Sequence, residues 1–190
     1  MIVIKYLIVL ITFSIFLSAN HLTDFYKLLD SSSIIKLRVD YKQSQFDNIF
    51  ESSGNCYLID YEEYYYESIE IKLYSRGNQL VTKNYKTNQI LYNDIDRTQF
   101  NILDLLSGRR DQIEFLDKDL DLHIYHFVIP SLGFKGFFDF RKDNGQLENA
   151  TLIIGPNQLI TINVISMEIL KNQFIPDLEV ENFEIIDLRE

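Results

Sequence analysis

The segment Ile69–Tyr92 constrains the fold of this chain more than any other. Apolar residues occupy every second position from Ile69 to Leu73, which is the two-residue period of a half-buried strand. Turn-forming residues follow around Gly77 and again around Asn88, and a further strand pattern begins after each of them. Three strands joined by tight turns predict an antiparallel meander with one broad apolar face.

The first nineteen residues have the order of a secretory signal peptide. One charged residue, Lys5, precedes an almost entirely apolar run, and Ser18-Ala19 supplies small residues before Asn20. A membrane anchor is the alternative, but the apolar run is short for a spanning helix and no basic stop-transfer cluster follows it. We expect residues 1–19 to be a cleaved signal peptide and residues 20–190 to form one domain. No Cys follows the run, so we expect no stable membrane anchor.

The net charge and the cysteine count limit the cell compartments and the partners that this chain can have. The full chain has a net charge of −10, which argues against nucleic acid as a partner. Cys56 is the only cysteine, so no internal disulfide can form in an exported protein. Secreted eukaryotic domains usually carry paired cysteines, and we therefore expect a bacterial periplasmic protein. The expected oligomeric state is a monomer.

Strand patterns recur at close spacing along the chain, with two short helices among them. The first helix is expected over His21–Leu29, and the second runs from a cap at Thr98 to Gly108. The expected strands are Ile35–Gln43, Asn55–Tyr61, Tyr65–Ser75, Gln79–Tyr85, Gln89–Asn93, Gln112–Leu116, Leu122–Ile129, Gly136–Arg141, Gln146–Ile154, Gln158–Ile165 and Glu184–Leu188. These strands, about eleven in number, predict a mainly β (α+β) fold with a single curved antiparallel sheet and helices over its mouth.

The residues that could support catalysis or metal binding are sparse. His123 and His126 are three apart in a strand pattern, so they should point to opposite faces and not share a metal. The acidic run Asp117–Asp121 resembles the start of a calcium loop but lacks its glycine and closing glutamate, and a solvated turn is favoured. Cys56 is expected to be a small buried hydrophobic residue. We therefore expect no enzyme activity, no cofactor and no metal site.

Several segments, in order over most of the chain, are similar to the LolA-type periplasmic carriers of outer-membrane lipoproteins. After the opening helix they are V-D-Y-K-Q-S-Q-F (Val39–Phe46), G-N-C-Y-L (Gly54–Leu58), S-R-G-N-Q-L with N-Y-K-T-N-Q-I (Ser75–Ile90), I-L-D-L-L-S-G (Ile102–Gly108), the late hairpins and F-E-I-I-D-L (Phe183–Leu188). The resemblance implies an incomplete barrel of antiparallel strands with helices as a lid over an apolar cavity. It also implies carriage of lipoprotein acyl chains from an inner-membrane donor complex to an outer-membrane acceptor.

One segment departs from that family. LolA-type carriers usually have a proline and an arginine in the segment that enters the third strand, and that arginine helps to hold the lid closed. The corresponding segment here, Tyr61–Glu67, contains neither residue. How the lid is controlled, which amphiphile is carried and which donor and acceptor are used are therefore left open by the sequence.

Apolar residues on alternating strand positions are the candidates for the cavity wall. For each residue, a place in an ordinary β core is the alternative to a place in the wall. The candidates are Leu37, Val39, Tyr41, Ile69, Ile71, Leu73, Tyr125, Phe127, Phe138, Phe140, Ile160, Ile162 and Val164, and the expected lid residues are Ile102, Leu105 and Leu106. The functional hypothesis is a periplasmic carrier of lipoprotein acyl chains. The alternatives are a carrier of another lipid or amphiphile, and a non-catalytic interaction module without cargo.

Overall fold

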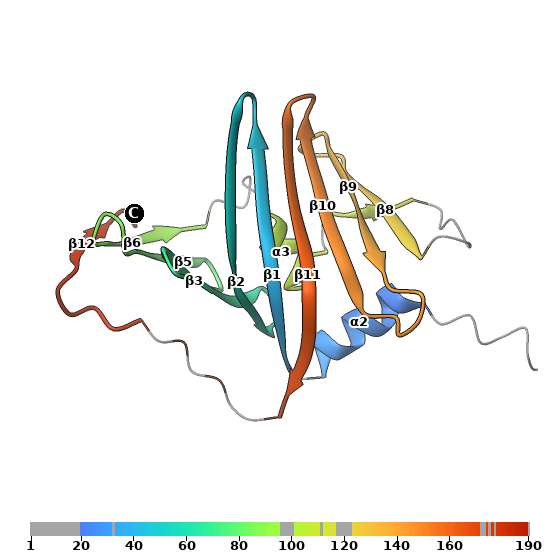
Figure 1. Cartoon of the computed structure of the whole chain (residues 1–190), viewed down its shortest axis with the longest axis horizontal. Coiled ribbons are helices and arrows are strands. Elements are labelled where there is room, and N and C mark those ends of the chain that lie inside the picture. The colour runs from blue at the N-terminus through green and yellow to red at the C-terminus, as the bar shows by residue number, and fades with distance from the viewer. Residues whose placement is uncertain are drawn as a thin grey trace, which may run out of the picture.

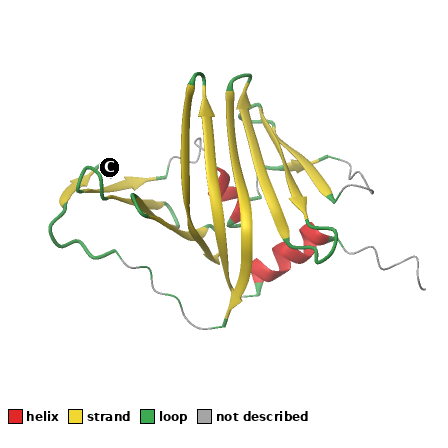
Figure 2. Cartoon of the chain, viewed as in Figure 1, coloured by secondary structure: helices red, strands yellow, loops and turns green. Residues whose placement is uncertain are grey.

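The computed structural model describes residues 20–31, 33–95, 101–110, 112–116, 123–171, 174, 176 and 178–189. The described helices are α2 (His21–Asp30) and α3 (Ile102–Leu106), and the strands are β1 (Ile34–Gln45), β2 (Asn48–Asp60), β3 (Glu63–Ser68), β4 (Ile71–Arg76), β5 (Gln79–Asn84), β6 (Gln89–Asp94), β7 (Glu114–Phe115), β8 (Ile124–Ile129), β9 (Phe134–Phe140), β10 (Leu147–Gly155), β11 (Gln158–Leu170) and β12 (Glu184–Asp187). Figures 1 and 2 show these strands as one curved sheet with the helices against it. The predicted mainly β fold is confirmed.

The described strands form one sheet whose order places the first strand beside the eleventh. The order is β12-β6-β5-β4-β3-β2-β1-β11-β10-β9-β8-β7. Two antiparallel meanders, β1 to β6 and β7 to β11, therefore join along the β1–β11 pair at the centre of Figure 1. The pairing departs from the expected antiparallel pattern at one edge, where β12 runs parallel to β6. Since the edge strands β7 and β12 do not pair with each other, the barrel is incomplete.

The inner face of the sheet carries the main core. Alternate residues of β1 point to this face, and Leu37 and Val39 are fully buried there. Their partners on β2 are Cys56 and Gly54, and burial raises the pKa of the Cys56 thiol to about 12. Cys56 is thus the buried hydrophobic residue that the sequence predicts.

Helix α2 forms where the sequence predicts it. The Asn20 side chain accepts a hydrogen bond of 3.2 Å from the Thr23 backbone N–H, which caps the first turn. The buried residues Leu22, Phe25, Tyr26 and Leu29 share one side of the helix, as the spacing predicts. This side packs against β1, β2 and β9, so α2 closes one end of the inner face.

The strand predicted over Tyr65–Ser75 is wrong, because the structure divides it into β3 and β4. The Ser68 hydroxyl accepts hydrogen bonds from the backbone N–H groups of Glu70 and Ile71, which forms a tight turn. Ile69 lies in this turn and is 92% exposed. The division accounts for the difference between the eleven expected strands and the twelve described ones.

The outer face carries a smaller cluster, which the segment after β11 covers. Tyr57 and Tyr65 are buried there, and the Phe174 ring stacks on Tyr57 with 4.1 Å between the ring centroids. The segment then reaches the far edge of the sheet, where it supplies β12 (Figure 1). In the described part of the chain, no helix has the length and apolar character needed to cross a membrane.

Candidate functional site

An apolar cavity lies on the inner face of the sheet, beneath the N-terminal end of α3. Strands β1 to β5 and β11 supply its walls, and the segment at the start of α3 closes one side. The lining residues are Val39, Tyr41, Phe50, Ser52, Tyr64, Tyr66, Ile71, Leu73, Leu80, Asn101, Ile102, Leu103 and Ile162. The cavity is therefore built by the first meander together with the central strand β11.

The cavity is uncharged and small. None of the described residues that line it is Lys, Arg, His, Asp or Glu. Its volume is about 190 Å³, and an apolar cavity of roughly 150 Å³ in another protein holds one benzene molecule. A short segment of one hydrocarbon chain fits this volume.

Three tyrosines turn their rings toward the cavity while other protein groups satisfy their hydroxyls. The Tyr66 hydroxyl lies 2.9 Å from the Ser52 hydroxyl, and the Tyr41 hydroxyl donates to the Gln43 side chain over 2.9 Å. Burial is the largest effect on the pKa of Tyr41, which rises to about 12, so the phenol is neutral at physiological pH. The third ring belongs to Tyr64, whose hydroxyl contacts α3.

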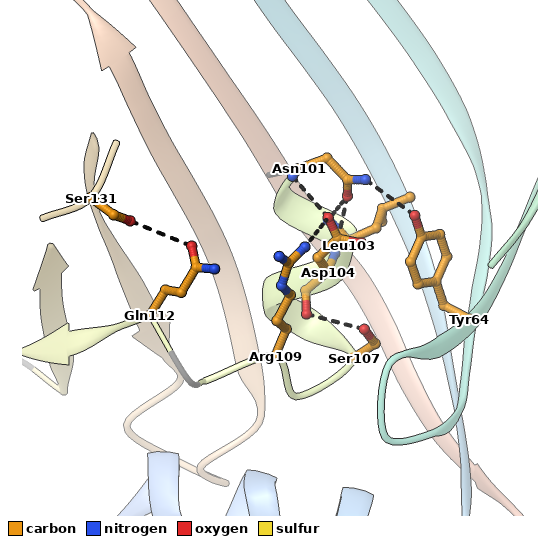
Figure 3. A network of polar contacts seen from close by, with 8 residues as sticks. All are labelled: Tyr64, Asn101, Leu103, Asp104, Ser107, Arg109, Gln112 and Ser131. Carbon is orange, nitrogen blue, oxygen red and sulfur yellow. Dashed lines mark hydrogen bonds and ion pairs between the residues drawn. The ribbon is translucent and has the colours of Figure 1, made fainter. Parts of the chain in front are cut away.

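Helix α3 begins at Asn101, not at the predicted cap Thr98, which lies outside the described residues. The Asn101 side chain accepts hydrogen bonds from the N–H groups of Leu103 and Asp104, at 2.7 Å and 3.0 Å. The Asp104 carboxylate accepts from the Asn101 backbone N–H at 3.0 Å, which completes a capping box (Figure 3). The cap stabilises a helix of five residues that would be marginal by itself.

Polar contacts join both ends of α3 to β3 and the turn before it. The Asn101 amide donates to the Tyr64 hydroxyl over 3.2 Å, and the Glu62 backbone N–H donates to the Ser107 carbonyl over 3.0 Å. Figure 3 shows Tyr64 facing the start of the helix. Hydrogen bonds as well as buried apolar side chains therefore hold α3 on the sheet. Tyr64 belongs to the segment in which LolA-type carriers place an arginine.

A buried ion pair lies behind α3. The Arg109 guanidinium is 3.8 Å from the Asp104 carboxylate, and both side chains are almost fully buried. Burial raises the pKa of Asp104, while the hydrogen bond from Asn101 and the charge of Arg109 oppose the rise. The pair links the helix cap to the residues that follow the helix, so α3 and its flanks form one hydrogen-bonded unit.

The structure brings only some of the predicted wall residues to the cavity. The predicted residues that line it are Val39, Tyr41, Ile71, Leu73 and Ile162. Those that lie in the core of the inner face but do not line it are Leu37, Ile160, Val164, Tyr125, Phe127, Phe138 and Phe140. Phe138 and Phe140 belong to the second meander, on the other side of the central pair. Ile69 is exposed and belongs neither to the cavity lining nor to the core of the inner face.

Of the three predicted lid residues, one contacts the cavity. Ile102 lines it, whereas Leu105 and Leu106 are fully buried in the core. Leu103, which was not predicted, takes part in the lining. The orientation of so short a helix depends on its cap, and the predicted cap was three residues too early.

The other lining residues missed from the sequence are polar or aromatic. Tyr64 and Tyr66 alternate with Tyr65, which is buried on the outer face, so alternation alone could not tell the two faces apart. Ser52 and Phe50 lie on the part of β2 that extends beyond the predicted strand. The pairing of β1 with β2 places them on the cavity face, because Ser52 pairs with Tyr41 and Phe50 pairs with Gln43.

His123 and His126 lie in different surroundings. The His123 ring lies 4.9 Å from the His21 ring, and the exposed His126 ring lies 5.8 Å from Phe137. Among the described residues, no group of three or more His, Cys, Asp or Glu is placed to hold a metal ion. The acidic run Asp117–Asp121 lies outside the described residues.

Comparisons with known proteins relate this chain to others by structure. No protein-family model matches the sequence, and no curated protein matches it. An uncharacterized conserved protein from Thermus thermophilus has a similar structure, with a TM-score of 0.50 and 7% identity, over 87% of this chain and 98% of that chain. At this identity the likeness shows a common fold and nothing more.

Two further similar structures come from proteins with descriptive names. One is a LolA superfamily protein from Nitrosomonas europaea, with a TM-score of 0.42, 9% identity and coverage of 85% of this chain and 96% of that chain. The other is a domain described as outer membrane lipoprotein-sorting, from Vibrio parahaemolyticus, with a TM-score of 0.45, 4% identity and coverage of 81% and 92%. The function is argued below from the residues of this chain.

Proposed function

We propose that the protein is a non-catalytic periplasmic carrier that binds an acyl chain of a lipoprotein, or of a similar amphiphile, in the cavity beneath α3. The uncharged apolar cavity is the observation that supports this proposal most directly. A hydrocarbon chain entering it loses contact with water, and each buried methylene contributes about 0.8 kcal/mol. Binding therefore needs no covalent step.

The lining favours a particular chemical form of the acyl chain. A free fatty acid carries a carboxylate, and burying a charge without a partner is costly. The described lining residues supply no cation to pair with it. An ester-linked or amide-linked chain has no such charge. We therefore expect neutral acyl chains to bind more tightly than free fatty acids.

To be released, the bound acyl chain must move from the cavity into another apolar environment. Helix α3 has five residues, which a few hydrogen bonds and the buried side chains of Leu105 and Leu106 hold on the sheet. So short an element can move while the strands stay paired. Its movement would widen the cavity and allow larger cargo to enter or leave. By resemblance, we propose an inner-membrane donor complex and an outer-membrane acceptor as the partners in this exchange.

A fluorescent acyl ester probe tests the proposal. Delipidated protein should bind the probe saturably, and Leu73→Trp should weaken binding because the larger ring fills the cavity that Leu73 lines. Ile185→Trp is the control, since Ile185 is 57% exposed on β12 at the sheet edge. The control should bind like the unaltered protein. Absence of saturable binding in a folded, delipidated preparation would instead favour an interaction module without cargo.

A further inference from the structure

Exposed apolar side chains gather at the tips of two neighbouring hairpins. The β1–β2 and β10–β11 hairpins extend beyond the other strands at the top of Figure 1. Phe46, Ile49 and Phe50 of the first tip are 67%, 62% and 49% exposed, and Leu159 of the second is 39% exposed. The Phe46 backbone N–H donates to the Asn157 carbonyl over 2.8 Å, so the two tips are joined. We refer to residues 43–50 and 153–160 together as the hairpin tips.

The hairpin tips are apolar on both faces of the sheet. Ile49 and Leu159 both pair with Ser44, so they lie on the outer face. Phe50 and Ile160 both pair with Gln43, and Phe50 lines the cavity on the inner face. A protein partner docking on a sheet usually covers one face, whereas an apolar medium surrounds both faces at once.

The charges around the hairpin tips are few and nearly balanced. Asp47 is the single charged residue within them, although the whole chain carries a net charge of −10. The next charges along the first hairpin, Lys42 and Glu51, form an ion pair of 2.8 Å. This pattern suits a neutral surface and gives no attraction to an anionic one.

The backbone of Phe46 gives a second, independent observation. Its φ is 53°, which is the left-handed region that Asn and Gly adopt more easily than bulky residues. A large aromatic ring at such a position is strained locally, and with 67% of the residue exposed it gains little from packing. A gain outside the folded monomer would account for it.

We propose that the hairpin tips insert into the surface of a neutral, zwitterionic lipid bilayer. Aromatic and aliphatic side chains gain free energy when they leave water for the boundary between headgroups and acyl chains. Phe50 belongs both to the hairpin tips and to the cavity wall, so insertion would bring the cavity to the membrane that holds its cargo. This last consequence rests on the proposed function, but insertion itself does not.

Co-sedimentation with phosphatidylcholine vesicles tests the insertion. The protein is taken as its host exports it, with its N-terminus identified by mass spectrometry, so that unaltered and variant proteins share the same start. Phe46→Asn combined with Ile49→Ser should weaken vesicle binding at least tenfold. Asn tolerates the backbone of position 46, so the thermal midpoint should not fall. Ile185→Ser, on the exposed β12 edge, is the control and should bind as the unaltered protein does.

The outcomes separate this proposal from the proposed function. The tip variant should still bind a soluble acyl probe, while Leu73→Trp should lose the probe but keep vesicle binding. Equal loss of vesicle binding in the tip variant and in Ile185→Ser would overturn the proposal, since it would mean non-specific adhesion. Failure of the unaltered protein to bind neutral vesicles would overturn it as well, and binding only to a protein partner would count against it.

Discussion

The side-chain amide of Asn101 donates a hydrogen bond of 3.2 Å to the hydroxyl oxygen of Tyr64. This contact joins the cap of α3 to β3 at the edge of the apolar cavity, and both residues line that cavity. A ligand in the cavity would contact both side chains. We therefore expect ligand binding to change the stability of α3 through Asn101 and Tyr64.

Tyr64→Phe should loosen α3 without unfolding the sheet. It removes the acceptor for the Asn101 amide, and a hydrogen bond of this kind contributes about 1 kcal/mol, or roughly a fivefold change in opening. Hydrogen exchange should become faster at Leu103–Ser107 and stay unchanged at Ile160–Val164. In the unaltered protein an acyl ligand should slow exchange at α3. Tyr65→Phe, on the opposite face of the same strand, is the control and should leave α3 unaffected.

The buried Asp104 should make stability depend on pH in the acidic range. Burial raises its pKa above the ordinary value of 3.8, so the folded protein holds this proton more tightly than the unfolded chain. Its contribution to the free energy of unfolding is therefore greatest below 3.8 and is lost as the pH rises through the raised pKa.

Urea unfolding of the unaltered protein and of Asp104→Asn across that range measures this dependence. The difference between the two free energies should change with pH above 3.8 and level off once Asp104 is ionised in the folded protein. Asp47→Asn, at an exposed turn, is the control for the loss of one carboxylate. A flat difference for Asp104→Asn would mean that the carboxyl titrates at its ordinary pKa.

Gly136→Ala should destabilise the second meander strongly. A Cβ atom at this position would lie 2.1 Å from the Thr151 carbonyl oxygen and 2.5 Å from the Phe127 ring, so the backbone of β10 would have to shift. Overpacking of this kind costs about 1–3 kcal/mol. Gly155→Ala is the control, because a Cβ there meets no atom within 4 Å, and chemical denaturation should find its stability nearly unchanged.

Phe140 and Leu73 should respond differently to truncation. Phe140 is almost fully buried against Tyr125, with 5.4 Å between the ring centroids, so Phe140→Ala should cost about 3–5 kcal/mol of stability. Leu73 is half-buried at the cavity, so Leu73→Ala should cost less stability and change probe affinity more. Thermal melting and probe titration of both variants check this. Selective loss of probe binding in a stable Phe140→Ala would show that the second meander also contacts cargo.

Much of the fold follows from local patterns in the sequence. The turn residues and the two-residue period place most strands, and the apolar spacing places α2 with its buried face. Two predicted boundaries failed because of individual side chains. The Ser68 hydroxyl accepts hydrogen bonds in the turn between β3 and β4, and Asn101 caps the start of α3, where Thr98 was predicted. The parallel pairing of β12 with β6 depends on contacts between distant segments, which periodicity cannot reveal.

The candidate site was harder to predict than the fold. Alternation identifies a buried face but does not distinguish a packed core from a cavity wall, and Phe138 and Ile71 show the same pattern with different outcomes. Helix α3 contacts β10 and β11, whereas the cavity lies beside Tyr64 and Leu73 of β3 and β4. The signal peptide expected over residues 1–19 stays a prediction, because those residues lie outside the described part of the chain.

The pairing of β1 with β11 also determines when the chain can finish folding. Ile34, the first residue of β1, pairs with Leu170, the last residue of β11. During synthesis the first meander therefore exposes an unpaired edge until β11 has appeared, and pairings of such long range form slowly. Premature termination anywhere before residue 158 would leave one edge of β1 without its partner strand, and such an edge can associate with other chains.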